Sequence, residues 1–183
     1  MRALTTALLL IALPLGWSPA QAQQPKLEMH RVGVDVGDGS GWYLAKSTKG
    51  SFAVRLPIPF NDFTTYDAGT GVANHVVGGK SSEGVKFSAI EVPITAATAS
   101  LDSIPKSFAS NPANKVSNVA SSTHDGIDTL SFSVDGPSSG GYFRYIRTKE
   151  RMYMLIVEYP KAYRELATAS KDKFLASFEF GKR

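Results

Sequence analysis

The sequence predicts an α+β domain in which an antiparallel β-sheet is flanked by helices. Short stretches of alternating apolar and polar residues recur along the chain, which is the period of a β-strand. The segments between them are short and rich in Gly, Asp, Ser and Lys, so consecutive strands are expected to pair antiparallel. The chain then ends in a segment whose apolar residues follow helical spacing, and such a helix buries one face of a sheet.

The 183 residues have the composition of an ordinary globular protein, since 43% are hydrophobic and 20% are charged. The chain has no Cys, which excludes a disulfide scaffold and a Cys-ligated metal or redox site. Its formal net charge of +4 is too small to indicate a nucleic-acid-binding protein, and we expect no nucleic-acid partner.

Residues 1–22 have the features of a cleaved signal peptide. Arg2 supplies a positive charge, Leu8–Leu15 form an apolar stretch, and Ala20-Gln21-Ala22 is the small-x-small pattern of a cleavage site. The apolar stretch is shorter than the roughly 20 residues that span a bilayer, so we expect no transmembrane anchor after cleavage. The sequence therefore predicts a periplasmic protein whose mature chain, residues 23–183, is a single domain.

In the first half of the chain, Val32, Val34 and Val36 alternate with smaller or polar residues and predict a first strand. Residues 42–46 and 51–56 are expected to form a hairpin. Further strands are predicted at 63–67, 75–78 and 85–92. Within the last of these the apolar residues change faces, which predicts a one-residue bulge near Ser88–Glu91.

In the second half, a short helix is expected to begin near Asp102 and to be stopped by Asn111-Pro112. Four more strands are predicted after it, at 116–122, 127–134, 141–147 and 152–158. Pro160 suits the start of a closing helix. The apolar face of that helix is predicted to comprise Tyr163, Leu166, Ala167, Ser170, Phe174 and Phe178.

Three segments of the chain resemble the PsbP-like superfamily: Gly41-Trp42-Tyr43, the G-x-F-x-V-x-L-P pattern of 50–57, and F-L-x-S-F at 174–178. The resemblance covers roughly Trp42 to Phe180. It implies an antiparallel sheet between helices, in an α/β/α sandwich. The superfamily includes the PsbP extrinsic proteins of photosystem II, DcrB-like envelope proteins and exported bacterial proteins of unknown function. Its members are mostly accessory or binding proteins without shared catalytic residues, so it implies no catalytic set here.

No motif in the sequence predicts a cofactor or a metal. Gly78-Gly79-Lys80-Ser81 ends like a phosphate-binding loop, but Asn74 stands where that loop requires Gly. Asp35 and Asp38 lack the alternating oxygen ligands of a calcium loop. The histidines, at positions 30, 75 and 124, show no pair at the spacing of zinc ligands.

The residues around His124 are the best candidates for acid–base chemistry. A histidine exchanges protons near neutral pH, and a carboxylate such as that of Asp128 can orient it. This pair is the basis of one alternative, a small hydrolase with a site near His124 and Asp128. The competing interpretation is a tight turn between two strands, because Asp125-Gly126 is a favoured turn pair.

The segment 142–153 combines aromatic and basic residues and is the best candidate for a binding site. Interleaved cations and rings can bind anionic ligands by charge and stacking. The alternative is a cross-strand ladder whose arginines are solvated or paired with Glu150 and Glu158. The candidate binding residues are Tyr142, Arg144, Tyr145, Arg147, Lys149 and Arg151.

These observations favour an exported, non-catalytic periplasmic protein that acts in binding or assembly. Its partner is expected to be an envelope protein or an anionic ligand, which the sequence does not identify. The hydrolase remains the alternative function.

Overall fold

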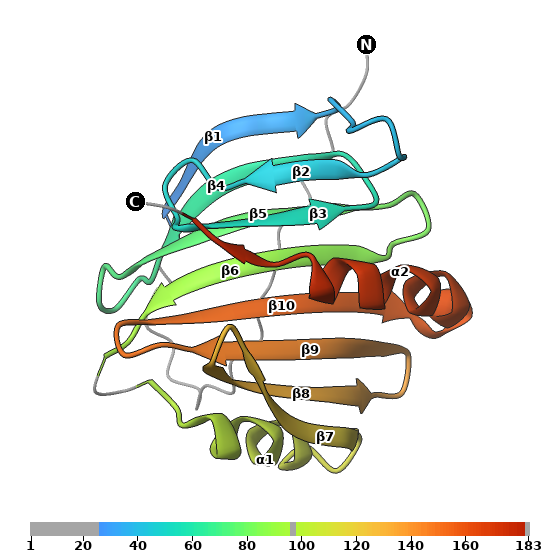
Figure 1. The fold of residues 1–183 in the computed structure, drawn as a ribbon. Coiled ribbons are helices and arrows are strands. Elements are labelled where there is room, and N and C mark those ends of the chain that lie inside the picture. The colour runs from blue at the N-terminus through green and yellow to red at the C-terminus, as the bar shows by residue number, and fades with distance from the viewer. Residues whose placement is uncertain (1–25, 96–97, 182–183) are drawn as a thin grey trace.

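The computed structural model describes residues 26–95 and 98–181, which form two antiparallel sheets and four helical segments (Figure 1). The large sheet has eight strands in the order β1-β4-β5-β6-β10-β9-β8-β7, and all its pairs are antiparallel. These strands are β1 (Lys26–Val34), β4 (Phe60–Tyr66), β5 (Ala73–Lys80), β6 (Lys86–Pro93), β7 (Lys115–His124), β8 (Ile127–Asp135), β9 (Ser139–Arg147) and β10 (Arg151–Pro160).

The small sheet has three strands in the order β11-β3-β2 and brings the end of the chain beside an early hairpin. Its strands are β2 (Tyr43–Lys46), β3 (Phe52–Leu56) and β11 (Glu179–Phe180). The helical segments are the 3₁₀ turns η1 (Leu101–Ser103) and η2 (Lys161–Tyr163), and the α-helices α1 (Ile104–Ala109) and α2 (Arg164–Ala176).

The small sheet and α2 cover one face of the large sheet, which we call the front face (Figure 1). Val54 of β3 and Phe174 of α2 belong to the same buried cluster as Leu155 and Val157 of β10. Alternation along each strand places these residues on the front face and their chain neighbours on the other. The main core of the protein therefore lies between the two sheets.

The opposite face, which we call the back face, is covered in part by α1. Phe108 of α1 lies 5.4 Å from Phe132 and 4.9 Å from Phe143, measured between ring centroids. Phe132 also stacks on Phe143 and on Tyr145. A second core made mainly of aromatic rings therefore holds α1 against β8 and β9.

The predicted hairpin at 42–56, the short helix, and the four strands that follow it are confirmed. The antiparallel α+β class is also confirmed, but the prediction of a sheet flanked by helices holds only in part. Six-residue α1 is the only α-helix described on the back face, and β2, β3 and β11 share the front face with α2.

No helix among the described residues is long and apolar enough to cross a membrane.

The closing helix differs from its prediction at both ends. Tyr163 and Leu166 are 41% and 46% exposed, so the buried face is narrower than expected. The helix ends at Ala176, and Phe178 lies beyond it in the segment that leads to β11. Phe178 is nevertheless buried, because leaving the helix lets its ring stack on Phe52 of the adjacent strand β3.

The bulge predicted near Ser88–Glu91 is wrong. The register of β6 with both of its neighbours runs without a shift. Phe87 and Ala89 face the front core, whereas Ile90 is buried and Val92 packs on the back core. The apolar residues change faces because β6 is a central strand that is covered on both sides.

The first strand was predicted too late in the chain. It runs from Lys26 to Val34, and its pairing with β4 ends at Val34 opposite Phe60. Val32 and Val36 are more than 70% exposed, so their alternation does not mark a buried face. The predicted signal peptide, residues 1–22, lies outside the described residues.

Candidate ligand-binding cleft

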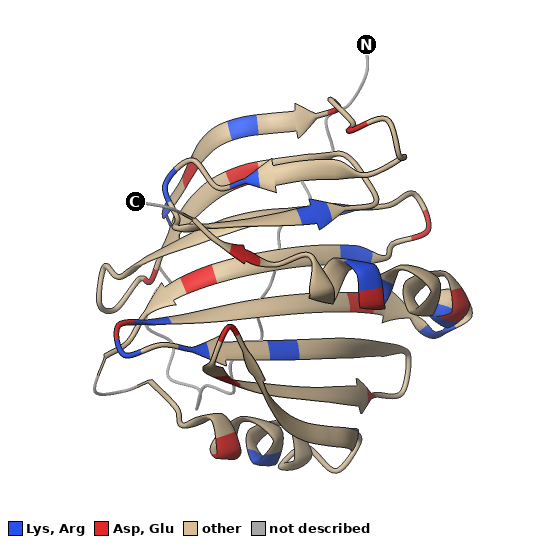
Figure 2. Ribbon diagram, in the orientation of Figure 1, with Lys and Arg blue, Asp and Glu red and all other residues tan. Residues whose placement is uncertain are grey.

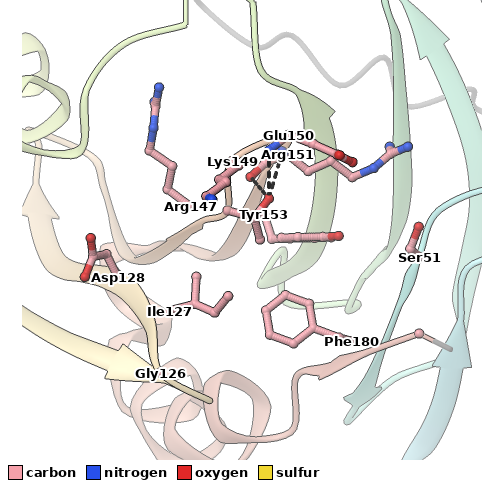
Figure 3. A pocket seen from close by; sticks show the side chains of 12 residues that line it. Ser51, Gly126, Ile127, Asp128, Arg147, Lys149, Glu150, Arg151, Tyr153 and Phe180 are labelled. Atoms are coloured by element: carbon pink, nitrogen blue, oxygen red, sulfur yellow. Dashed lines mark hydrogen bonds between the residues drawn. The ribbon is translucent and has the colours of Figure 1, made fainter.

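A cleft of about 780 Å³ opens at one end of the large sheet, where two hairpin turns meet the C-terminal segment (Figure 3). The turn between β9 and β10 provides Arg147–Arg151 and the turn between β7 and β8 provides Gly126–Asp128. Most of the remaining lining comes from Tyr153 of β10, Phe180 of β11 and Ser51. The volume lies in the range of clefts that hold small molecules in other proteins.

The turn between β9 and β10 is fixed by Thr148. The N–H of Thr148 donates to the carbonyl of Arg151 at 2.9 Å, and its hydroxyl oxygen accepts from the N–H of Arg151 at 2.9 Å. Lys149 and Glu150 are consequently presented at the tip, and both are exposed. Figure 2 shows that this turn carries charges of both signs.

The turn between β7 and β8 is the two-residue turn expected at Asp125-Gly126. Both residues have positive φ, at 50° and 76°, as a primed hairpin turn requires, and Gly adopts this conformation without strain. His124 pairs with Ile127 across the turn, and Ile127 packs on the front core. The turn therefore brings an apolar side chain to the cleft.

The floor of the cleft is apolar and consists of Ile127, Tyr153 and Phe180 (Figure 3). The Phe180 ring is 5.4 Å from the ring of Tyr153 and 5.0 Å from that of Phe178, both edge to face. The ring of His124 lies 5.8 Å from the ring of Phe180. These contacts hold the half-buried Phe180 ring in one orientation.

A buried ion pair lies beneath the rim. Glu91 of β6 is 1% exposed and pairs with Arg151, and its second carboxylate oxygen accepts the N–H of Ser51 at 2.6 Å. The pair thus links the large sheet, the turn between β9 and β10, and the start of β3. A charge this deeply buried is retained only when it is paired and hydrogen-bonded.

The buried polar residues continue from Glu91 across the front face. His75 lies opposite Glu91 in the register of β5 with β6, and its Nδ1 is 3.1 Å from the hydroxyl of Thr64. The same hydroxyl is 2.8 Å from Nε2 of His30. Burial is the main cause that lowers the pKa of His75 below its ordinary value of 6.5, and the positive charge of Arg151 acts in the same direction.

The negative charges of Glu91 and Asp62 oppose this shift in the pKa of His75.

The sequence predicted neither the Glu91–Arg151 ion pair nor the row of polar residues formed by Glu91, His75, Thr64 and His30. No motif connects residues that lie on different strands. The one available signal was a charged residue, Glu91, inside a segment that otherwise reads as a buried strand.

Three of the six candidate binding residues line the cleft, namely Arg147, Lys149 and Arg151. The Arg147 guanidinium points away from Phe180 in Figure 3 and donates to the carbonyl of Ala99 at 2.6 Å. Arg151 is bound to Glu91, as described above. Lys149 makes no hydrogen bond or ion pair with any residue in 26–95 or 98–181.

The other three lie elsewhere. Arg144 lies under α2 and donates to the carbonyl of Leu175 at 2.9 Å, which satisfies a free carbonyl at the end of that helix. The Tyr142 hydroxyl is 2.7 Å from that of Thr168, also on α2. Tyr145 is buried on the back face. The three residues that line the cleft lie at or next to the turn between β9 and β10, whereas these three lie farther along β9, two of them beneath α2 and one in the back core.

The structure does not bring His124 and Asp128 together. His124 pairs with Ile127, so Asp128, the next residue along, points to the opposite face of the hairpin. The acid beside His124 is Asp125, whose carboxylate oxygen is 3.8 Å from the imidazole Nε2. Among the described residues, no group of three or more His, Asp or Glu side chains gathers in a way that suits a metal ion.

The two sheets and their helices define a class of fold, an antiparallel α+β domain. The solution structure of cyanobacterial PsbP (CyanoP) from Synechocystis sp. PCC 6803 is similar, with a TM-score of 0.52 and 14% identity over 82% of this chain and 97% of that one. The fold is therefore PsbP-like, as the sequence resemblance implied.

The crystal structure of LpqN, involved in cell envelope biogenesis of Mycobacterium tuberculosis, also matches. Its TM-score is 0.42 and its identity 10%, over 90% of this chain and 88% of LpqN. No family model and no curated protein matches the sequence.

Proposed function

We propose that this chain is a non-catalytic accessory protein that acts outside the cytoplasm and holds an anionic group of a ligand or partner protein in the cleft. The observation that carries the proposal is Lys149, an exposed cation at the rim of an apolar floor, with no ion pair to any described residue. A cation in this position is available to an incoming anion without first giving up a partner.

The proposed location rests on the sequence. Residues 1–22 have the pattern of a cleaved signal peptide, which directs a chain out of the cytoplasm. The PsbP-like fold supports an accessory role, since members of the superfamily that the sequence resembles are mostly accessory or binding proteins. The proposal is favoured over the hydrolase alternative because His124 and Asp128 lie on opposite faces of their hairpin.

The experiment is affinity capture of the mature protein from its own envelope fraction, with bound proteins and lipids both identified. Lys149→Glu should reduce what is captured, and added salt should reduce it further, because an exposed charge contact is screened. Lys161→Glu is the matched control, since this exposed lysine lies at the opposite end of β10, roughly 30 Å away. Equal capture by wild type and Lys149→Glu would remove the cleft from consideration.

A further inference from the structure

We infer that the cleft takes a small amphiphile with a flat apolar ring and a single negative charge, such as an aromatic carboxylate or sulfonate. This inference rests on the proposed function and names the chemical class of the ligand. It follows from the shape of the floor, from which cations are available, and from the acids on the rim.

The floor suits a flat ring. Phe180 is held by aromatic contacts to Tyr153 and Phe178, and one side of it lines the cleft together with Ile127. A ring that is already fixed loses little conformational entropy when a second ring stacks on it. The cleft volume, about 780 Å³, is sufficient for a bicyclic molecule.

The available positive charge is Lys149. Arg151 is bound to Glu91, and Arg147 is turned toward the carbonyl of Ala99. Lys149 alone among the three cations of the lining has no partner within the described ranges. One available cation fits one anionic group.

The acids on the rim limit the ligand to a single negative charge. Asp128 and Glu150 also line the cleft, and both are exposed. Like charges placed side by side repel each other, so these carboxylates disfavour a dianion such as a phosphate monoester. They tolerate a monoanion whose charged group lies next to Lys149.

The probe for this class is 8-anilinonaphthalene-1-sulfonate, an aromatic monoanion whose fluorescence rises on binding. Saturable binding of one probe per folded chain is expected, with competition by 1-naphthoate and none by inorganic phosphate. The uncharged analogue N-phenyl-1-naphthylamine should bind more weakly. Near-ultraviolet circular dichroism establishes that each protein is folded, because the sulfonate probe also binds partly unfolded chains.

Two variants test the two parts of the ligand. Phe180→Ala should weaken binding of the sulfonate probe about tenfold by removing the ring contact. Lys149→Gln removes the charge of an exposed turn residue and should weaken binding of the sulfonate probe about threefold. Lys161→Gln is the control and should have no effect.

The outcomes separate this inference from the proposed function. No binding of the sulfonate probe, together with envelope capture that depends on Lys149, would overturn the aromatic class and leave the anion site standing. Equal binding of the charged and uncharged probes, unaffected by Lys149→Gln, would overturn the anionic part. Envelope capture that does not depend on Lys149 would contradict the proposed function itself.

Discussion

The two faces of the large sheet are covered by different kinds of side chain. The back face is an aromatic core, in which Phe132, Phe143 and Tyr145 stack and α1 adds Phe108. The front face has an apolar centre but ends in buried polar and charged groups, of which Glu91 is 1% exposed and Thr64 is 2% exposed. The free energy of unfolding should therefore depend on side-chain volume at the back face, and on both volume and charge at the front face.

The largest effect is expected from Phe174→Ala, which removes a fully buried ring that meets Phe87 edge to face at 5.5 Å on the front face. A cavity of this kind costs about 3–5 kcal/mol of unfolding free energy. Urea unfolding measures it, with Lys171→Ala on the same helix as the control expected to change little. Similar small effects in both variants would mean that α2 is not docked on the sheet.

The next effect is expected from Glu91→Gln, which keeps the shape of the side chain but leaves Arg151 without its counter-charge. Breaking a buried pair from one side is strongly destabilising, and because Arg151 is partly exposed we expect about 2–4 kcal/mol. Glu158→Gln is the control, since Glu158 is exposed and lies 3.6 Å from Lys86. Its loss should cost less than about 1 kcal/mol. Equal losses in urea unfolding would contradict the structural role of the buried pair.

A smaller loss of stability is expected when the pH is lowered. Since the pKa of His75 in the folded protein lies below 6.5, the unfolded chain binds the proton first as the pH falls. Stability attributable to His75 is therefore intact above about pH 6.5 and declines below it, by at most about 1.4 kcal/mol per pH unit, until the folded protein also binds the proton.

His75→Asn should flatten this part of the stability profile, measured as the urea midpoint between pH 7.5 and pH 5.5. Met154→Leu, a change at a half-buried position packed against the back core, serves as the control and should keep the wild-type slope. An unchanged slope in His75→Asn would assign the acid sensitivity to other groups.

The smallest effect is expected from Tyr145→Phe on the back face. Tyr145 is 6% exposed and stacks on Phe132, and its hydroxyl makes no hydrogen bond to any residue in the described ranges. Because this oxygen has no hydrogen bond to lose, its removal should lower the unfolding free energy by less than about 0.5 kcal/mol. A loss as large as that of Glu91→Gln would contradict the distinction between the two faces.

Structural features that depend on residues close together in the chain were predicted well from the sequence. The hairpin at 42–56 follows from strict alternation, and the turn at Asp125-Gly126 follows from the backbone preferences of those two residues. The bulge in β6 was predicted wrongly because alternation was assumed to mean one buried face, whereas β6 is covered on both.

The candidate site was predicted less well, for a physical reason. Lys149 and Arg151 stand out locally because they lie in a cluster of basic residues. The apolar floor depends on Phe180 meeting Tyr153, and the buried pair depends on Glu91 meeting Arg151. Both are set by how distant strands pair, which no local spacing encodes.

The pairing of β11 with β3 has a consequence for how the chain matures. Phe180, almost the last described residue, pairs with Phe52 in a hairpin formed early in the chain. Contacts between such distant positions form slowly, because a long loop has to close first. During synthesis one edge of the hairpin therefore stays unpaired until the chain has been made as far as β11. A product cut short before Phe178 would lack this strand and the Phe180 ring of the cleft floor, so any ligand binding at this cleft would also report that the chain has been made through Phe180.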